Sequence, residues 1–321
     1  MKKKIVIIAG DPNSINSEII YKTWKNLNNS IKKNLYIIGN YNLIKKQFKK
    51  LKIKQKIIKL ENIEFNKNII DLKIINIPLL FKKPFDVPLN SASKYVLSSL
   101  DLGHKLSMQE KIKGIINCPI DKKLIKKTKK PGVTELLASK CKLKNSSEVM
   151  MIHNKKLSVV PITTHISLKR VSSQLNKHLV INKTLTLNNG FIRLFKKKPK
   201  IGILGLNPHN GELNKKSEEI KHIIPAISYL KKKNVHVFGP LVADTIFINN
   251  FKKFDVIVGM YHDQVLAPFK SLFHFNAINI TLGLEYIRVS PDHGPATDLI
   301  GKNKGNYLSL LKCVKFMNNL D

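Results

Sequence analysis

Three histidines each follow a short run of apolar residues, just beyond the point where that run ends. They are His165 after residues 159–164, His209 after residues 201–206, and His262 after residues 256–260. Short β-branched runs bounded by Gly, Pro and Asn are typical of buried strands. Because ligands of open α/β sheets bind beyond the carboxyl ends of the strands, the three imidazoles are expected at one binding edge. The pattern predicts a three-histidine metal site with open positions, able to act as a Lewis acid on a substrate oxygen.

The alternative is that each of these residues is an isolated loop histidine. For any one of them alone, that is the simpler interpretation. The same placement at a strand end occurs three times, however, and each histidine lies within a dense polar motif. This repetition favours the metal site.

The elements that must position these residues alternate between strand-like and helix-like segments, which predicts an α/β fold. Strands are expected at 4–9, 35–38, 114–117, 235–237 and 277–281. Helices are expected at 18–27, 41–50, 91–111, 134–140, 166–174, 182–195 and 218–232. The segment 276–301 is dense in Gly, Pro, Asp and Thr, and a long polar connection of this kind in a compact domain is usually functional.

Length and composition narrow the class of protein. The 321 residues suffice for two packed lobes or for one large α/β unit with an insertion. No apolar stretch reaches the length of a membrane span, and the run after residues 1–4 is too short for a signal peptide. We therefore expect a cytoplasmic protein with no membrane partner. The cysteines form no CxxC pair and predict neither a disulfide framework nor a cysteine zinc site; they are Cys118, Cys141 and Cys313.

The net charge of +36 would suit a nucleic-acid-binding protein, but its distribution does not. The lysines are spread over the whole length and are not interleaved with aromatic residues. We expect weak, salt-sensitive affinity for polyanions and no specific nucleic-acid partner. The chain has only three arginines, Arg170, Arg193 and Arg288. In so lysine-rich a chain, Arg288 is a candidate for a planar, bidentate donor.

Six motifs in a fixed order carry a family resemblance. They are 10–12 (Gly-Asp-Pro), 164–165 (Thr-His), 205–212 (Gly-Leu-Asn-Pro-His-Asn-Gly-Glu), 239–245 (Gly-Pro-Leu-Val-Ala-Asp-Thr), 260–264 (Met-Tyr-His-Asp-Gln) and 279–284 (Asn-Ile-Thr-Leu-Gly-Leu), the last running on to Arg288 and 292–294 (Asp-His-Gly). On these motifs the chain resembles, nearly end to end, the 4-hydroxythreonine-4-phosphate dehydrogenases of pyridoxal phosphate biosynthesis. Those enzymes are related in fold to isopropylmalate and isocitrate dehydrogenases.

The resemblance implies an architecture and an assembly. The expected fold is a two-lobed α/β/α structure of the isocitrate/isopropylmalate dehydrogenase type. Residues 1–125 together with 285–321 would form the lobe on the cofactor side, and residues 126–284 the lobe for metal, substrate and dimer contacts. The expected assembly is a homodimer, with the three histidines holding a divalent cation at its interface.

The resemblance also implies a reaction and a set of substrate contacts. The reaction is NAD-dependent oxidation of the C3 hydroxyl of 4-phosphohydroxy-L-threonine, after which the β-keto acid loses CO2 to give an amino-ketone phosphate. The positions matching the family's substrate contacts are Thr134, Lys270, Asn279 and Arg288. Lys270 and Arg288 suit a phosphate as charge-assisted donors, and Asn279 adds a neutral donor and acceptor. Lys270 taken alone would be interpreted as a surface lysine.

Asp244 and Asp263 are candidates for catalytic work beside the histidines. Carboxylates near ligating histidines commonly orient the imidazole and raise its basicity, and these two could also transfer protons. The alternative for both is a capping or turn role. No general base is evident. The native cation also stays open, with zinc, magnesium and cobalt as candidates, because imidazole ligands suit several metals.

The cofactor site lacks a dinucleotide fingerprint, since no GxGxxG follows a strand. The loop 292–302 resembles the nucleotide-binding loop of the isopropylmalate dehydrogenase relatives. On this resemblance the contacts to NAD are expected from Asp292, His293, Gly294, Ala296 and Asp298. A purely structural turn is the alternative.

The chain departs from the family pattern at three places. Val133 stands where the family has the His of a His-Thr-Glu motif, the loop 10–18 lacks two glycines, and Asp121 replaces Asn or His before Lys122. Valine cannot donate a hydrogen bond to a phosphate or carboxylate. Two alternatives therefore stay open: the same chemistry on a related phosphorylated four-carbon hydroxy acid, and a non-catalytic homologue that binds metal or polyanions.

Overall fold

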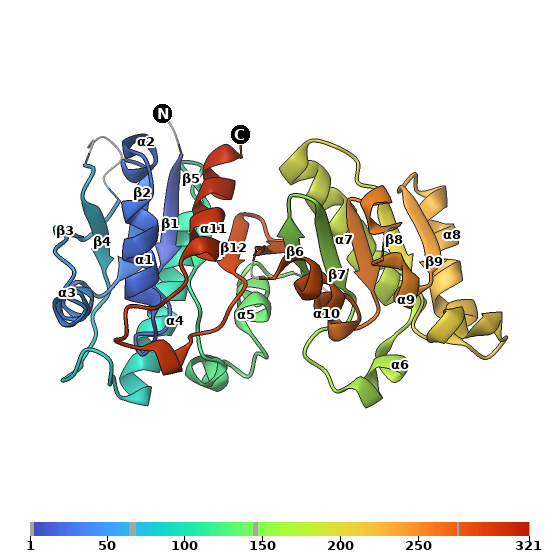
Figure 1. Cartoon of the computed structure of the whole chain (residues 1–321), viewed down its shortest axis with the longest axis horizontal. Helices are drawn as coiled ribbons and strands as arrows, with labels where there is room; N and C mark the ends of the chain where they lie inside the picture. Colours follow the sequence, from blue (N-terminus) through green and yellow to red (C-terminus); the bar gives the residue numbers. More distant parts are fainter. Residues whose placement is uncertain (1–2, 64–68, 144–146, 249, 275, 321) are drawn as a thin grey trace. The chain divides into compact units, whose positions relative to one another are not determined.

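The computed structural model describes residues 3–63, 69–143, 147–248, 250–274 and 276–320. The chain divides into two compact units, Met1–Lys142 with Leu284–Asp321, and Leu143–Gly283. Strands and helices alternate in each unit (Figure 1), as predicted for an α/β fold. No helix among the described residues is both long and apolar enough to cross a bilayer.

The first unit contains a wholly parallel run of strands. Their spatial order is β3 (Ile57–Leu60), β4 (Leu72–Asn76), β2 (Leu35–Gly39), β1 (Lys4–Ile8), β5 (Ile112–Asn117) and β12 (Ile287–Pro291). Every residue of β1 and β2 is buried, as expected when helices cover both faces of a parallel sheet. The helices are α1 (Asn16–Lys25), α2 (Asn29–Lys32), α3 (Tyr41–Lys50), α4 (Leu89–Ser107), η1 (Lys122–Thr128), α5 (Val133–Lys140), η6 (Thr297–Leu299) and α11 (Leu308–Asn319).

The second unit contains a run of strands of mixed direction. Its order is β11 (Ile278–Leu282), β6 (Val149–Asn154), β7 (Leu157–Pro161), β10 (Val256–Gly259), β8 (Ile201–Leu204) and β9 (Val237–Leu241). β7, β10, β8 and β9 run parallel, whereas β6 is antiparallel to both neighbours. The helical segments are η2 (Leu168–Arg170), α6 (Val171–Gln174), α7 (Lys177–Phe195), η3 (Pro208–Leu213), the π-helical turn η4 (Glu219–Ile223), α8 (Ile224–Lys232), α9 (Ala243–Ile246), η5 (Asn250–Lys253) and α10 (His262–Phe273).

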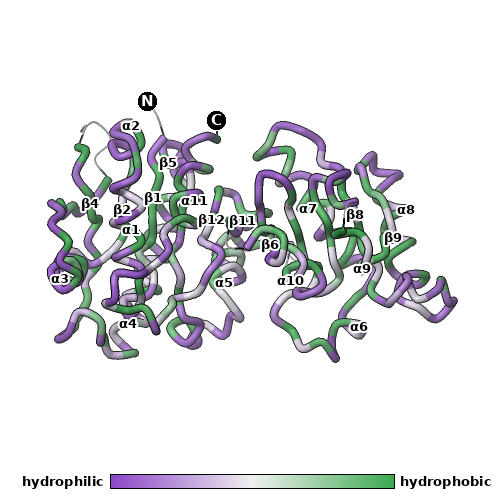
Figure 2. Tube along the Cα trace, viewed as in Figure 1, coloured by the Kyte–Doolittle hydropathy of each residue, from purple (hydrophilic) through white to green (hydrophobic). Residues whose placement is uncertain are grey.

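Apolar side chains gather along the strands of each unit. Figure 2 shows the hydrophobic colour following the strands, while the outer turns are mostly hydrophilic. In the second unit Val159, Leu204 and Ile257, one from each of three neighbouring strands, belong to a single buried cluster with Phe269 of α10. This cluster holds α10 against the strands that carry the histidines.

The division between the units differs from the expected one at its first boundary. Residues 126–142 belong to the first unit, not the second. Leu124, Ile125 and Leu137 are almost fully buried, and Ser93 of α4 donates a hydrogen bond to the Leu124 carbonyl (2.6 Å). These contacts fasten η1 and α5 to the first unit, so the chain leaves it only after α5. The second boundary falls at 283/284, one residue before the expected position.

The strand expected at 235–237 begins later. Asn234 adopts a positive φ of 57°, and the Val235 N–H donates to the Leu230 carbonyl (3.0 Å). This is a helix-terminating arrangement, so Val235 closes α8 and the strand β9 starts at Val237.

Candidate active site

The three predicted metal ligands follow three neighbouring strands. β10 pairs in parallel with β7 on one side and with β8 on the other. His165 comes after β7, His209 after β8, and His262 begins α10 after β10. Because parallel neighbours end at the same edge of a sheet, the loops that carry the histidines share one edge, as predicted.

At this edge each histidine has another histidine or a carboxylate as a neighbour. The rings of His165 and His262 have centroids 5.9 Å apart. His262 Nδ1 lies 2.7 Å from the Asp263 carboxylate, and His209 Nε2 lies 4.0 Å from Asp244. Among the residues that the structure describes, no three His, Cys, Asp or Glu side chains form a closed metal-binding group. The structure thus brings two of the three ligands together and places a carboxylate beside two of them.

The donor set suits a divalent cation. Imidazole is a common ligand of such cations, and the three rings lie on accessible loops. His165 and His209 have positive φ values of 53° and 49°. Non-glycine residues in this left-handed region are uncommon and cluster at functional sites.

Side chains beside the histidines tie the strand ends together. Gln264, two residues after His262, accepts the Met260 N–H (2.6 Å) and donates to the Gly205 carbonyl (2.7 Å). Thr163 donates its hydroxyl to the Met260 carbonyl (2.7 Å). The ends of β7, β10 and β8 are therefore cross-linked. Sequence reasoning missed these residues, although Gln264 lies inside a motif that it singled out.

Arg288 and Thr134, both predicted substrate contacts, meet inside the first unit. Arg288 is 3% exposed, and its Nη1 donates to Thr134 Oγ1 (3.0 Å). Its Nε donates to Asn117 Oδ1 (2.6 Å), a partner that sequence reasoning missed. Burial lowers the pKa of Arg288 to about 10, so the side chain stays cationic at neutral pH.

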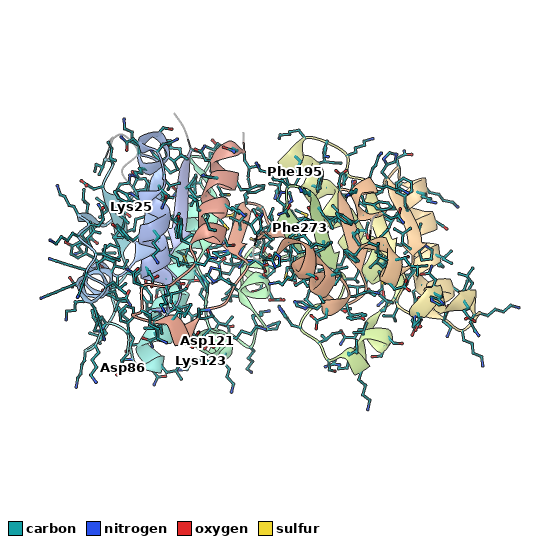
Figure 3. The ribbon with its side chains drawn as sticks, in the orientation of Figure 1. Lys25, Asp86, Asp121, Lys123, Phe195 and Phe273 are labelled. Atoms are coloured by element: carbon teal, nitrogen blue, oxygen red, sulfur yellow. The ribbon has the colours of Figure 1, made fainter. Side chains whose placement is uncertain are left out.

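Lys270 and Asn279 belong to the second unit, with the histidines. Lys270 follows the fully buried Phe269, whose ring packs at 4.9 Å on that of Phe273, labelled in Figure 3. Asn279 lies on β11, and its Oδ1 is buried without a hydrogen-bond partner among the described residues. A buried acceptor of this kind is costly unless a ligand satisfies it.

The expected cofactor loop lies over the start of α1. The Ile15 N–H donates to the Pro295 carbonyl (3.4 Å), and Glu18 accepts the Gly305 N–H (2.5 Å). Ala296 has a positive φ of 48°. A Cβ added at Gly294 would meet nothing within 4 Å.

Several buried polar atoms around this loop have no hydrogen-bond partner among the described residues. They are Asn16 Oδ1, Ser17 Oγ, Glu18 Oε2 and His293 Nε2. His293 Nδ1 lies 2.9 Å from the Gly294 carbonyl, and the Asp292 N–H donates to Ser309 (3.0 Å). Asp298 is exposed on η6. Such a concentration of unused polar groups fits a polar ligand such as a nucleotide.

The departures from the family pattern have local structural roles. Asp121 accepts the Lys123 N–H (2.9 Å) and so caps η1, and its carboxylate lies 3.2 Å from Lys123 Nζ (Figure 3). Asn16 of the loop 10–18 donates to the Pro119 carbonyl (2.8 Å). Val133 is the first residue of α5, directly before Thr134.

Comparisons of the sequence with known proteins show similarity along the whole chain. The family model described as pyridoxal phosphate biosynthetic protein PdxA matches residues 30–317. The 4-hydroxythreonine-4-phosphate dehydrogenase of Aquifex aeolicus is 38% identical over 328 residues, covering 100% of this chain and 99% of that protein. A putative D-threonate 4-phosphate dehydrogenase of Oceanobacillus iheyensis is 36% identical, covering 98% of this chain and 96% of that protein.

Solved structures agree. A crystal structure of the 4-hydroxythreonine-4-phosphate dehydrogenase from Klebsiella pneumoniae matches with a TM-score of 0.85 at 28% identity, covering 98% of each chain. Isocitrate dehydrogenase from Methylococcus capsulatus matches with a TM-score of 0.50 at 11% identity, covering 99% of this chain and 85% of that one, which shows a shared fold alone. The predicted fold class is confirmed, and the chain belongs to the PdxA family of pyridoxal phosphate biosynthetic proteins.

Proposed function

We propose that the protein is a cation-dependent, NAD-linked dehydrogenase of 4-phosphohydroxy-L-threonine. Hydride leaves C3 for NAD and the hydroxyl loses its proton, giving 2-amino-3-oxo-4-phosphooxybutyrate. This β-keto acid then loses CO2 to give 3-amino-2-oxopropyl phosphate. The observation that carries the proposal is the delivery of three accessible histidines to one edge of a sheet by β7, β10 and β8.

His165, His209 and His262 are the residues that would hold the cation. A cation bound there would supply Lewis-acid polarisation of the substrate hydroxyl. Asp263 engages His262 Nδ1 and so leaves Nε2 as the ligating nitrogen. Asp244 lies 4.0 Å from His209 Nε2, beyond hydrogen-bond distance, so a closer approach of Asp244 would leave Nδ1 as the ligating nitrogen of His209.

The remaining residues would bind the substrate and the cofactor. Lys270 would supply a charge-assisted donor for the phosphate, and Asn279 an amide whose oxygen is otherwise unsatisfied. Arg288 would act as a rigid cation, because Asn117 and Thr134 fix its guanidinium. NAD would occupy the loop of Asp292, His293, Gly294, Ala296 and Asp298, where it would satisfy the unused polar atoms.

The proposed assembly is a homodimer that covers the histidine loops. Three large apolar side chains are exposed, two after the histidines and one after α9: Leu168 (68%), Leu213 (56%) and Ile248 (67%). They follow His165, His209 and Asp244, respectively, within a few residues. Exposed apolar side chains gathered around a candidate site are typical of a protein–protein interface.

A second candidate substrate is a phosphorylated four-carbon hydroxy acid such as D-threonate 4-phosphate. Val133 favours it, because a valine beside Thr134 offers no hydrogen bond to the substrate. The relative from Oceanobacillus iheyensis carries that substrate in its name. The chemistry at C3 would be the same.

The test is NADH formation by the purified protein, followed by absorbance with NAD and each of the two substrates. The proposal predicts turnover that disappears when the protein is chelated and returns when a divalent cation is added back. Turnover of D-threonate 4-phosphate alone would select the second candidate. Absence of turnover with both substrates, in protein shown to bind the cation, would contradict both.

A further inference from the structure

Two consecutive glutamates lie at the start of the π-helical turn η4, and both contact the loops that carry the histidines. Glu219 is 0% exposed. Its Oε1 accepts the backbone N–H groups of Leu206 (2.7 Å) and Asn207 (2.8 Å). Its Oε2 accepts the Asn207 side-chain amide (3.0 Å). One buried carboxylate thus holds the backbone directly before His209.

Glu218 links this turn to a second histidine loop. Its Oε2 accepts a second hydrogen bond from the Asn207 side-chain amide (2.8 Å). Its Oε1 accepts a hydrogen bond from the Ser172 hydroxyl. Ser172 belongs to the segment after His165. The glutamate pair therefore joins the loop of His165 to the loop of His209.

The local sequence is built to let Glu219 approach. A Cβ at Gly205 would lie 3.0 Å from Glu219 Oε1, and a Cβ at Gly211 would lie 3.1 Å from Glu219 Oε2. Gly211 also has a φ of 61°, within a run from His209 to Leu213 in which every φ is positive. Such a run is unfavourable for L-residues and needs fixed contacts to persist. π-Helical turns frequently mark functional sites.

Both carboxylates are favoured in the ionised form. Burial would raise the pKa of Glu219, but hydrogen bonds from Asn207 and Leu206 outweigh it and hold the pKa below its usual value. The hydrogen bonds from Ser172 and Asn207 lower the pKa of Glu218. An ionised carboxylate accepts stronger hydrogen bonds from amides than a neutral side chain does.

We propose that Glu218 and Glu219 are positioning residues that hold the loops of His165 and His209 in the arrangement needed to bind a divalent cation. The inference rests on the proposed function, since it presumes a cation at the three histidines. It adds residues that lie outside that site and act on it through Asn207 and Ser172. Gln264 performs the matching task for the third loop, because it joins Met260 to Gly205.

The test is Co2+ binding by the full-length chain, measured by calorimetry and by the visible spectrum of the bound ion. Glu219→Gln keeps the shape of the side chain but replaces one carboxylate oxygen by an NH2 group. This group would face the N–H donors of Leu206 or Asn207, which it cannot accept. We expect its Co2+ affinity to fall about tenfold or more, with altered visible bands, because the ligand geometry changes. Ser172→Ala, at an exposed position, removes only the link to the His165 loop and should give a smaller loss in a folded protein.

The control is Asp255→Asn in the same unit. Asp255 also accepts a backbone N–H, that of Lys200 (2.9 Å), but it lies at the start of β10, at the opposite end of the strand from His262. Asp255→Asn should leave the Co2+ affinity and the visible spectrum of the bound ion unchanged, even where its loss of thermal stability is similar to that of Glu219→Gln. If the wild type binds Co2+ and Glu219→Gln and Ser172→Ala bind it identically, the inference is overturned and the proposed function stands. If the wild type binds no cation, both fail.

Discussion

The guanidinium of Arg288 has two of its nitrogens engaged, Nε by Asn117 and Nη1 by Thr134. A lysine at this position would offer all its donors from a single nitrogen and would lose the planar fork whose separate nitrogens meet these two acceptors. The position therefore uses one of the few arginines of the chain for its planar geometry. A lysine at position 288 would supply the same positive charge without this geometry.

We predict that Arg288→Lys lowers the free energy of unfolding by about 2 kcal/mol, because a buried acceptor is left unsatisfied. If the residue binds phosphate, kcat/KM should fall about tenfold or more as well. Urea denaturation and NADH formation measure the two effects. Arg170→Lys, at an exposed position, serves as the control and should change stability by no more than about 0.5 kcal/mol.

Val133 sets a prediction for substrate choice. Val133→His adds a donor at the first residue of α5 and should shift the ratio of kcat/KM values toward 4-phosphohydroxythreonine and away from D-threonate 4-phosphate. Val133→Phe adds bulk without a donor and should not produce this shift. If the wild type, Val133→His and Val133→Phe share the same ratio of kcat/KM values, Val133 does not determine substrate choice.

The β6–β7 pair contains a partly buried histidine outside the candidate site. His153 lies opposite Ser158 in the register, with its Nδ1 2.9 Å from the serine hydroxyl and its ring 4.9 Å from Phe195. Burial lowers the pKa of His153 to about 4. The unfolded chain therefore binds a proton that the folded chain resists between pH 6.5 and about 4.

From this sign we predict that His153 reduces stability as the pH falls from 6.5 to about 4 and has no such effect above 6.5. His153→Gln should lose less stability than the wild type over that range. Urea midpoints at several pH values measure the difference. His236→Gln, at an exposed position, is the control and should follow the wild type. Parallel curves for wild type and His153→Gln would contradict the prediction.

Elements also show how far the sequence could predict the structure. The strands before the histidines were predictable because β-branched runs end in Gly, Pro or Asn, and α3 was predicted with its observed bounds. The partners of Asn117 and Glu219 were not predictable, since they lie far along the chain or are backbone amides. The predicted start of β9 at residue 235 was wrong because Asn234 and Val235 take part in the turn that ends α8.

At the scale of the whole molecule, the chain forms two units, each with its own run of strands and its own set of predicted site residues. The histidines, Lys270 and Asn279 belong to the second unit, and Arg288, Thr134 and the loop 292–302 to the first. The resemblance assigned Thr134 to the lobe of residues 126–284, but Thr134 lies in the first unit because η1 and α5 pack on α4. Packing between elements decides such a boundary, and residue patterns do not record it.

The proposed dimer gives a prediction at this scale. Leu168→Asp combined with Ile248→Asp places charges at two exposed apolar positions of the proposed interface, one after His165 and one after α9, and should shift the protein from dimer to monomer in sedimentation velocity. Leu80→Asp in the first unit, where the leucine is 83% exposed, should leave the dimer intact. A monomeric wild type would refute the proposed assembly.

We propose that three histidines, each following one of three neighbouring strands, hold the cation on which oxidation depends. The most direct measurement is a titration of chelated wild type and His209→Ala with a divalent cation, following bound metal and NADH formation together. NADH formation by the wild type should rise in proportion to the cation bound at one site per chain. His209→Ala should bind the cation more weakly and recover activity only at higher cation concentrations. Full activity without a cation, or unchanged cation binding by His209→Ala, would contradict the three-histidine site.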